Sequence, residues 1–115
     1  MKNREIAEIF ETIADLLEIK GEAIYRVVAY RRAGEILRTL GRDVNKIWEE
    51  GDLETIPGVG KAIAAKIDEL LRTDHLEFYE KLTAEVPPGL AKILKVGGVG
   101  PKKAARFWKE LGITA

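Results

Sequence analysis

A short glycine turn that precedes a helix occurs twice in this chain, about forty residues apart. Residues 56–62 and 96–102 each hold an apolar residue, then Gly-Val-Gly, then a lysine in the first turn of an expected helix. Glycine allows positive φ, and a helix start directs unpaired N–H groups and a positive dipole end outward. Such a turn can hold a phosphate, and two of them suggest a ligand with repeating phosphates, which is a nucleic acid. The residues expected at these contacts are Gly58, Gly60, Lys61, Gly98, Gly100, Lys102 and Lys103.

Other phosphate-binding loops fit these turns less well. A dinucleotide-binding loop needs a preceding strand and a third glycine, and neither copy has either feature. A P-loop needs Gly-Lys-Ser/Thr after four intervening residues, which is also missing. For either copy taken alone, an ordinary connection between two helices remains an alternative.

Lys66 is the residue best placed by the sequence to act as a nucleophile. It falls within a helix expected over about residues 61–73, on the edge of the stripe expected to be buried. Partial desolvation there would make the free amine available for attack. The alternative is a lysine that only extends along the edge of the core. The buried stripe should consist of Ile63, Ile67, Leu70 and Leu71.

The elements that position these residues are expected to be helices only. The 115 residues are rich in Ile, Leu, Ala, Glu and Lys, with little Val-Thr alternation, which indicates a compact all-α domain. Asn3 is expected to cap the first helix, and Gly21 and Gly41 to end the first two. The helices are expected at about residues 3–20, 23–40, 44–50, 61–73, 76–86, 89–96 and 101–111.

Composition narrows the class of protein. There is no cysteine, and no stretch approaches the about 20 apolar residues of a membrane span. We therefore expect a cytoplasmic protein with no membrane partner. Lys and Arg number 19 and Asp and Glu also 19, and this balance argues against strong nonspecific DNA binding. Residues 89–111 nevertheless carry six basic residues against Glu110, so one end of the chain is compatible with DNA.

The second expected helix is apolar on more than one side. Its buried face should centre on Ala29, Ala33, Ile36, Leu37 and Leu40. A second group should point away from that face and form a surface for a protein partner or another copy of the chain. This group consists of Ile24, Tyr25, Val27, Val28 and Gly34.

Both glycine turns resemble the hairpin of the helix-hairpin-helix DNA-binding motif. From about residue 3 to residue 113, the chain resembles the N-terminal region of bacterial and archaeal family X (polymerase β-like) DNA polymerases. The resemblance implies a lyase-type domain at residues 1–75 and a second helix-hairpin-helix subdomain at residues 76–115. It implies binding to gapped or nicked DNA without sequence preference. The matching segments are residues 3–7, 26–33, 86–90 and 100–104.

The resemblance also implies roles for single residues. Lys66 matches the lysine that forms a Schiff base with 5′-deoxyribose phosphate in lyase-active relatives, and Tyr30 and Arg26 match positions beside it. Arg31 is a further DNA-binding candidate, although such arginines often form only a solvated face. No cofactor is required, but hairpins of this type bind Na⁺ or K⁺ through backbone carbonyls. Those carbonyls would belong to Glu54, Ile56, Val59, Leu94, Val96 and Val99.

The sequence departs from the family pattern at several positions. Relatives have Asn-Pro and an aromatic where this chain has residues 23–25, and a base is common at Val28. Two hypotheses follow. The first is a DNA-binding fragment of a family X repair polymerase, with or without lyase activity. The palm carboxylates of such an enzyme lie on a later domain, so these residues alone are not expected to polymerise DNA. The second is a protein-interaction module, natural or engineered, built on the same scaffold.

Overall fold

The computed structural model describes residues 1–86, and within that range the chain folds into α-helices and one short 3-10 helix. No strand occurs in this part of the chain, which confirms the expected all-α fold. No helix within these residues is long and apolar enough to span a membrane. The elements are α1 (Asn3–Lys20), α2 (Ile24–Thr39), α3 (Val44–Glu49), η1 (Leu53–Thr55), α4 (Lys61–Thr73) and α5 (Glu77–Glu85).

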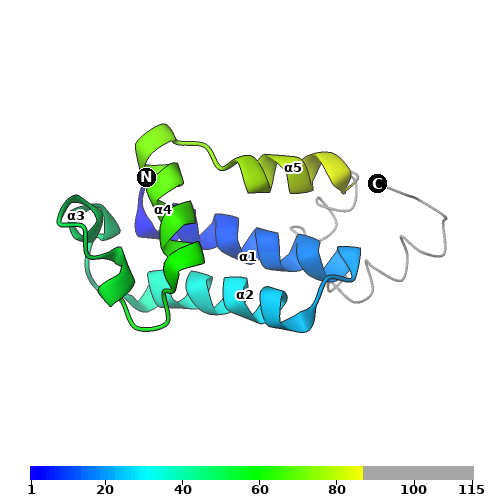
Figure 1. Cartoon of the computed structure of the whole chain (residues 1–115), viewed down its shortest axis with the longest axis horizontal. Helices are drawn as coiled ribbons and strands as arrows, with labels where there is room; N and C mark the ends of the chain where they lie inside the picture. The colour runs from blue at the N-terminus through cyan, green and yellow to red at the C-terminus, as the bar shows by residue number, and fades with distance from the viewer. Residues whose placement is uncertain (87–115) are drawn as a thin grey trace.

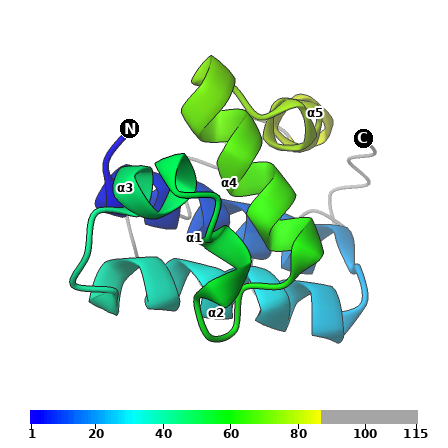
Figure 2. The same ribbon diagram turned by 60° about the vertical axis from the view of Figure 1, so that its left-hand side comes forward.

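Helices α1 and α2 form an antiparallel pair that supports the other elements (Figure 1). Gly21 ends α1 in the left-handed conformation, at φ +77°, and its N–H donates to the carbonyl of Glu18. Helix α2 starts three residues later, so the two helices lie side by side along most of their length. Figure 2 shows α4 crossing this pair at a steep angle, with α3 at one end. Helix α5 packs against α1.

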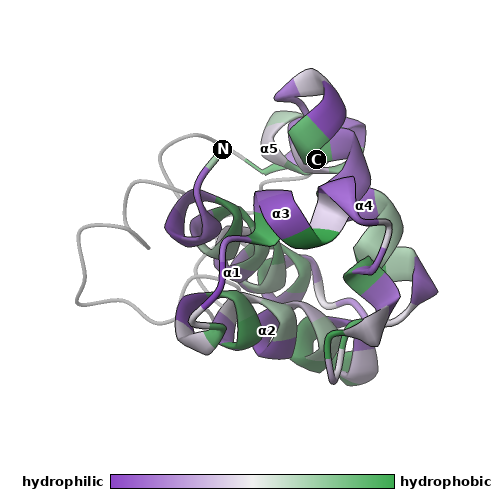
Figure 3. Ribbon diagram, turned by 90° about the vertical axis from the view of Figure 1, so that its left-hand side faces the viewer, coloured by the Kyte–Doolittle hydropathy of each residue, from purple (hydrophilic) through white to green (hydrophobic). Residues whose placement is uncertain are grey.

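The core lies where these helices meet. Figure 3 shows hydrophobic residues gathered between α1, α2 and α4, with hydrophilic residues on the outward faces. Helix α4 contributes Ile63, Ala64, Ile67 and Leu70, while Leu71 is only partly buried. Its bounds agree with the expected helix at residues 61–73. The largest side chains that are fully buried include Phe10, Ile6, Ile13, Leu16, Leu37, Ile47 and Ile67.

The predicted buried face of α2 was wrong by part of a turn. Val27 is 2% exposed and Gly34 is buried, whereas Ala29 is exposed. The reason is the close approach of α2 to α1. A Cβ atom on Gly34 would lie 2.8 Å from Cγ of Glu11 and 3.2 Å from the carbonyl oxygen of Ala7. Gly34 therefore serves contact between two helices of this chain and not contact with a partner.

Asn3 does not cap α1 as expected. Lys2 occupies the N-cap position, and Asn3 is the first residue of the helix. The Asn3 side chain instead holds the loop between α2 and α3. Its Nδ2 donates to the carbonyl of Arg42 at 2.6 Å, and its Oδ1 accepts from the N–H of Val44 at 2.9 Å.

Candidate nucleic-acid interface and amine site

The first glycine turn is a tight loop seated on α2. Its apolar residues Ile56 and Val59 are buried, and the N–H of Val59 donates to the carbonyl of Ile56 at 3.0 Å. Gly58 between them has φ +87°, in the region that favours glycine. A Cβ atom at Gly58 would lie 2.5 Å from Cδ1 of Ile36. Gly58 thus allows both the turn and its close contact with α2.

The turn leads directly into the start of α4. Gly60 is the N-cap residue, and its carbonyl accepts the first bond of the helix, from the N–H of Ala64 at 2.9 Å. The three N–H groups before Ala64 have no partner within the helix ladder and point beyond its end. No side chain caps them. Lys61 is exposed at the same end. This arrangement of N–H groups, helix dipole and lysine can bind a phosphate oxygen.

The helix before the hairpin is joined to the helix after it by one side-chain bond. The indole Nε1 of Trp48 donates to Oδ1 of Asp68 at 2.8 Å, and Nε of Arg72 lies 3.4 Å from Oδ2. The bond from Trp48 and the neighbouring guanidinium lower the pKa of the Asp68 carboxyl. A cavity of about 350 Å³ beside this bond is lined by residues of α3, η1 and α4, including Lys61.

Three of the residues singled out in the sequence gather around Phe78, the second residue of α5. The Nζ atom of Lys66 lies 5.1 Å from the centroid of the Phe78 ring, and Cζ of Arg26 lies 5.7 Å from it. The ring of Tyr30 stacks on the same ring, with centroids 5.8 Å apart and planes inclined by 22°. Helices α2, α4 and α5 therefore each contribute to one aromatic and cationic cluster. The side chain of Lys66 is half-buried there.

Phe78 was not identified from the sequence. The sequence shows only that Phe78 is an apolar residue of a short amphipathic helix. This pattern does not indicate which residues of other helices its ring will contact. Its ring is half-buried, and Tyr30 is sandwiched between it and Phe10, whose centroid is 5.9 Å away. Burial raises the pKa of the Tyr30 hydroxyl above its usual value, so this group stays neutral near pH 7.

The two arginine candidates lie in different surroundings. Nη1 of Arg26 lies 3.2 Å from a carboxylate oxygen of Glu22, at the edge of the Phe78 cluster. Arg31 contacts Asp15 at 2.9 Å and Glu18 at 3.4 Å, both on α1. Burial raises the pKa of the Asp15 carboxyl despite the opposing effect of that guanidinium. Arg31 therefore bridges α2 to α1 and does not join the cluster.

The expected interaction surface is only partly present. Ile24, Tyr25 and Val28 are 68%, 74% and 44% exposed, in agreement with the sequence analysis. Val27 and Gly34 were expected beside them, but both are buried in the core between α1 and α2. The exposed surface is therefore smaller than the sequence suggested.

The backbone carbonyls expected to bind a monovalent cation are described for the first hairpin only. The carbonyl of Ile56 accepts one hydrogen bond within the turn, which leaves a second lone pair for another ligand. Residues 1–86 contain no cluster of three or more His, Cys, Asp or Glu side chains that could hold a metal ion. The contacts predicted for the second hairpin lie outside the described residues; they involve Leu94, Val96, Gly98, Val99, Gly100, Lys102 and Lys103.

Comparison with known proteins agrees with this geometry. A family described as "Helix-hairpin-helix domain" matches residues 1–76. Over 113 residues the chain is 35% identical to the "DNA polymerase/3'-5' exonuclease PolX" of Bacillus subtilis (strain 168), covering 98% of this chain and 19% of that protein. It is 29% identical over 110 residues to the "DNA polymerase lambda" of Rattus norvegicus, covering 96% of this chain and 18% of that protein. The chain thus spans about a fifth of the length of these relatives.

Proposed function

Because this chain belongs to the helix-hairpin-helix domain family, we propose that it is a DNA-binding part of a family X repair polymerase. It binds backbone phosphates at gaps or breaks, without sequence preference. The observation that carries this proposal is the open start of α4 behind the turn at Gly58, with Lys61 exposed beside it. Both relatives described above are named as DNA polymerases, which supports the same partner.

The proposed contact explains why no sequence preference is expected. The groups offered at the start of α4 are backbone N–H groups and one lysine, and both suit phosphate oxygens. The turn itself consists of Gly58, Val59 and Gly60, and none of these residues has a side chain long enough to read the edges of bases in a groove. The second glycine turn, at residues 96–102, is proposed to hold further phosphates along the same DNA.

The Phe78 cluster supports a finer proposal for the end of a broken strand. Arg26 would bind a 5′-phosphate, and Lys66 would lie close to the sugar that carries it. The neutral amine of Lys66 would add to the C1′ aldehyde carbon of the ring-opened deoxyribose, and loss of water would give a Schiff base. Tyr30 would line this site as a neutral hydroxyl group. Lyase activity of this kind is the catalytic part of the proposal.

Two structural expectations remain part of the proposal. The first is the division into a lyase-type unit at residues 1–75 and a second helix-hairpin-helix unit at residues 76–115. The second is a Na⁺ or K⁺ ion held by hairpin carbonyls, among them that of Ile56. Such an ion would add positive charge next to the phosphate that the start of α4 holds.

The decisive experiment is DNA binding by fluorescence anisotropy over a range of salt concentrations. The ligand is a gapped duplex with a 5′-phosphate in the gap, and the comparison is the intact duplex. If about four phosphates are held, log K should fall with log salt at a slope of about −3 to −4. Lys61→Glu should weaken binding by at least about tenfold, since one charge-assisted contact is lost and a repulsion is added.

A matched control is available on α5. The side chain of Lys81 is 70% exposed, and this residue does not belong to the turn. Lys81→Glu therefore makes the same change in charge at a position outside the proposed contact. It should weaken binding much less than Lys61→Glu. Equal losses in the two variants, or an affinity that does not depend on salt, would contradict the proposed contact.

A second candidate function rests on a separate observation. Ile24, Tyr25 and Val28 are the large hydrophobic side chains that are exposed within residues 1–86, and all three lie at the start of α2. Exposed apolar side chains of neighbouring turns are typical of a protein contact. We propose a protein partner or another copy of the chain at this surface, as an alternative to DNA.

A further inference from the structure

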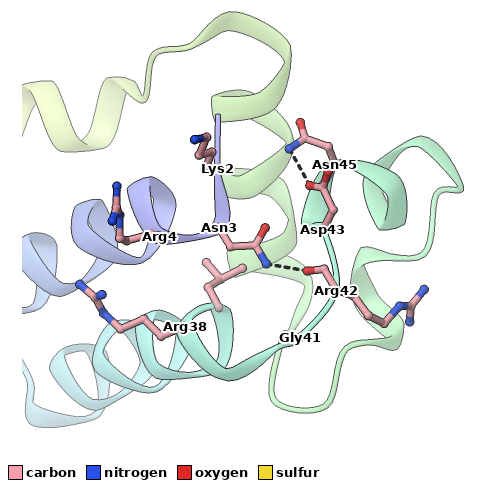
Figure 4. A pocket seen from close by; sticks show the side chains of 9 residues that line it. Lys2, Asn3, Arg4, Arg38, Gly41, Arg42, Asp43 and Asn45 are labelled. Carbon is pink, nitrogen blue, oxygen red and sulfur yellow. Dashed lines mark hydrogen bonds between the residues drawn. The ribbon is translucent and has the colours of Figure 1, made fainter.

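A cavity of about 530 Å³ opens at the end of the molecule where α1 begins and α2 ends (Figure 4). It is lined by the first residues of α1, the last turn of α2 and the loop that leads to α3. Four lining side chains are basic and one is acidic, in a chain whose formal net charge is zero. We call this cavity the basic pocket. Its charged residues are Lys2, Arg4, Arg38, Arg42 and Asp43.

The walls of the basic pocket are joined by hydrogen bonds. The side chain of Asn3 bonds to backbone groups of Arg42 and Val44, as described above. From the other side, Nδ2 of Asn45 donates to the carbonyl of Met1 at 2.8 Å. These bonds hold the loop before α3 against the start of α1. The backbone of the pocket walls is therefore fixed before any ligand arrives, whereas Lys2, Arg4 and Arg42 extend from it as exposed side chains.

The single acidic residue of the lining is engaged elsewhere. Oδ1 of Asp43 accepts from the side chain and from the backbone N–H of Asn45, each at 3.0 Å, and so caps α3. These two hydrogen bonds lower the pKa of the Asp43 carboxyl, which stays ionised near pH 7. Its carboxylate is thus held at the N-terminal end of α3, and the lining carries four basic side chains against this one acid.

The basic residues differ in how much they are already neutralised. Arg38 pairs with Glu11 through two hydrogen bonds, of 2.7 and 2.8 Å, but a guanidinium has five donors and three remain. Lys2, Arg4 and Arg42 make no ion pair with another residue of the described part of the chain. Figure 4 shows Lys2 and Arg4 on one side of the bond between Asn3 and Arg42, with the Arg42 side chain on the other side.

We propose that the basic pocket binds a phosphate ester. Lys2, Arg4 and Arg38 place one ammonium and two guanidinium groups on the same side of the bond between Asn3 and Arg42, and such groups match the charge of a phosphate group. The phosphate would belong either to a nucleic-acid strand or to a free phosphate ester. The cavity is within the size range of pockets that hold small molecules.

This site is separate from the glycine turn. Gly58 of the turn contacts α2 at Ile36, whereas the basic pocket uses Leu37 and Arg38 of the same helix. Ile36 and Arg38 are two residues apart and so point to nearly opposite sides of α2, since each residue turns the helix by about 100°. The proposal stands without the proposed function of the turn, and a failure of one leaves the other untouched.

The test is an NMR titration of the full 115-residue chain with inorganic pyrophosphate at constant ionic strength. The signals to follow are the side-chain amides of Asn3 and Asn45 and the Nε–H of Arg4. We expect these signals to shift and saturate in the wild type. The double variant Lys2→Gln/Arg4→Gln should raise the apparent Kd at least about tenfold, because two charge-assisted contacts are lost. Its amide spectrum serves as the check that the fold is unchanged.

Two control variants make the result specific. Arg72→Gln removes one positive charge from a side chain that is 60% exposed on α4, and it should leave the pyrophosphate titration unchanged. Lys81→Gln removes an exposed positive charge from α5 and should also leave it unchanged. If the Asn3 and Asn45 signals do not move in the wild type, or if Arg72→Gln weakens binding as much as the double variant, the proposal is wrong.

A second arm separates the two sources of phosphate. A ten-nucleotide oligothymidylate replaces pyrophosphate in the same titration. If it shifts the same signals and pyrophosphate displaces it, the pocket holds a strand phosphate. If only pyrophosphate acts, the pocket holds a free phosphate ester. Both of these outcomes support the site, whereas a failure of both ligands overturns it.

Discussion

The indole N–H of Trp48 and the carboxylate of Asp68 form a 2.8 Å hydrogen bond that spans the glycine turn from one helix to the next. Trp48 lies on α3 and Asp68 lies on α4, so the bond fixes the angle at which the start of α4 is presented. Both side chains are only partly buried, and a second contact from Arg72 holds the other carboxylate oxygen. The geometry of the turn therefore depends on a polar contact as well as on its apolar residues.

Removing the acceptor should weaken this part of the fold. Asp68→Ala leaves the indole N–H of Trp48 without its partner, and we expect the free energy of unfolding to fall measurably. Asp68→Asn keeps an acceptor oxygen and should cost clearly less. Urea unfolding followed by circular dichroism measures both variants. Equal losses for Ala and Asn would show that the hydrogen bond itself contributes nothing.

Among the glycines outside the helices in residues 1–86, Gly58 should be the one least tolerant of replacement by alanine. Gly58→Ala places a side chain at φ +87° and also brings Cβ to 2.5 Å from Cδ1 of Ile36. Gly51→Ala is the matched control, because φ is +75° there but no atom lies within 4 Å of the new Cβ. We expect about 1–2 kcal/mol of lost stability for the control, from backbone conformation alone, and more for Gly58→Ala.

The excess at Gly58 can be assigned by a double variant. Ile36→Val shortens the side chain that the new Cβ meets, so part of the excess loss should disappear when both changes are made together. Thermal unfolding of the four proteins gives the coupling. A Gly58→Ala protein no less stable than Gly51→Ala would contradict the close contact between the turn and α2.

Lys66 should be the amine that is trapped if the proposed lyase chemistry occurs. Borohydride reduction with incised abasic DNA should give a covalent adduct, and Lys66→Ala should remove most of it. Lys46→Ala is the control, since this lysine is exposed on α3 and belongs to no proposed contact with DNA. Adduct formation that survives in Lys66→Ala assigns the reaction to another amine. The absence of adduct in the wild type would reduce the proposed function to DNA binding.

The exposed apolar surface on α2 makes a prediction about oligomeric state. Ile24→Glu with Val28→Arg changes two side chains that are 68% and 44% exposed, so thermal stability of the isolated chain should change little. If the surface joins two copies, the wild type should sediment as a dimer and the double variant as a monomer. A monomeric wild type whose double variant unfolds several degrees lower would show that the two residues serve the core.

The ion pair between Glu11 and Arg38 should make the free energy of unfolding depend on pH in the acidic range. Hydrogen bonds from Arg38 lower the pKa of the Glu11 carboxyl below its usual value of 4.5 in the folded chain. The stabilisation is therefore present above pH 4.5 and is lost as the pH falls through the lowered pKa. Because the pair is partly exposed, we expect only about 0.2–1 kcal/mol at pH 7.

The measurement for this pair is the difference in unfolding free energy between the wild type and Glu11→Gln. The difference should shrink as the solution is acidified, and it should also shrink at high salt, which screens exposed charges. A difference that stays constant across this pH range would mean that Glu11 acts through packing and not through its charge.

Sequence patterns predicted the helices well and their rotation less well. The apolar spacing of α4 is strong, and its bounds at Lys61–Thr73 agree with the expectation. In α2, apolar and small residues occur on several sides, so periodicity could not choose between Ala29 and Val27 as core residues. The close approach of Gly34 to the backbone of α1 decides that choice, and no pattern within α2 encodes it.

The candidate amine site around Lys66 was likewise predicted from the sequence only in part. Lys66, Tyr30 and Arg26 were identified from their types and positions, and the structure brings them together. Phe78, which they share, was missed because its role arises only when α5 packs against the rest of the chain. Asn3 was assigned as a cap since asparagine is common there, but a bond to a loop about forty residues away took precedence.

Helix α5 continues the buried core beyond the residues that the family match covers. The family match ends at residue 76, yet the buried core continues through Leu82 and Val86 of the following segment, and Lys20 of α1 pairs with Glu85. A chain cut by a protease after residue 76 would keep its glycine turn but would expose apolar surface of α1 to water. We expect such a fragment to aggregate, because residues 77–86, which the proposed division assigns to the second unit, cover part of the core of the first.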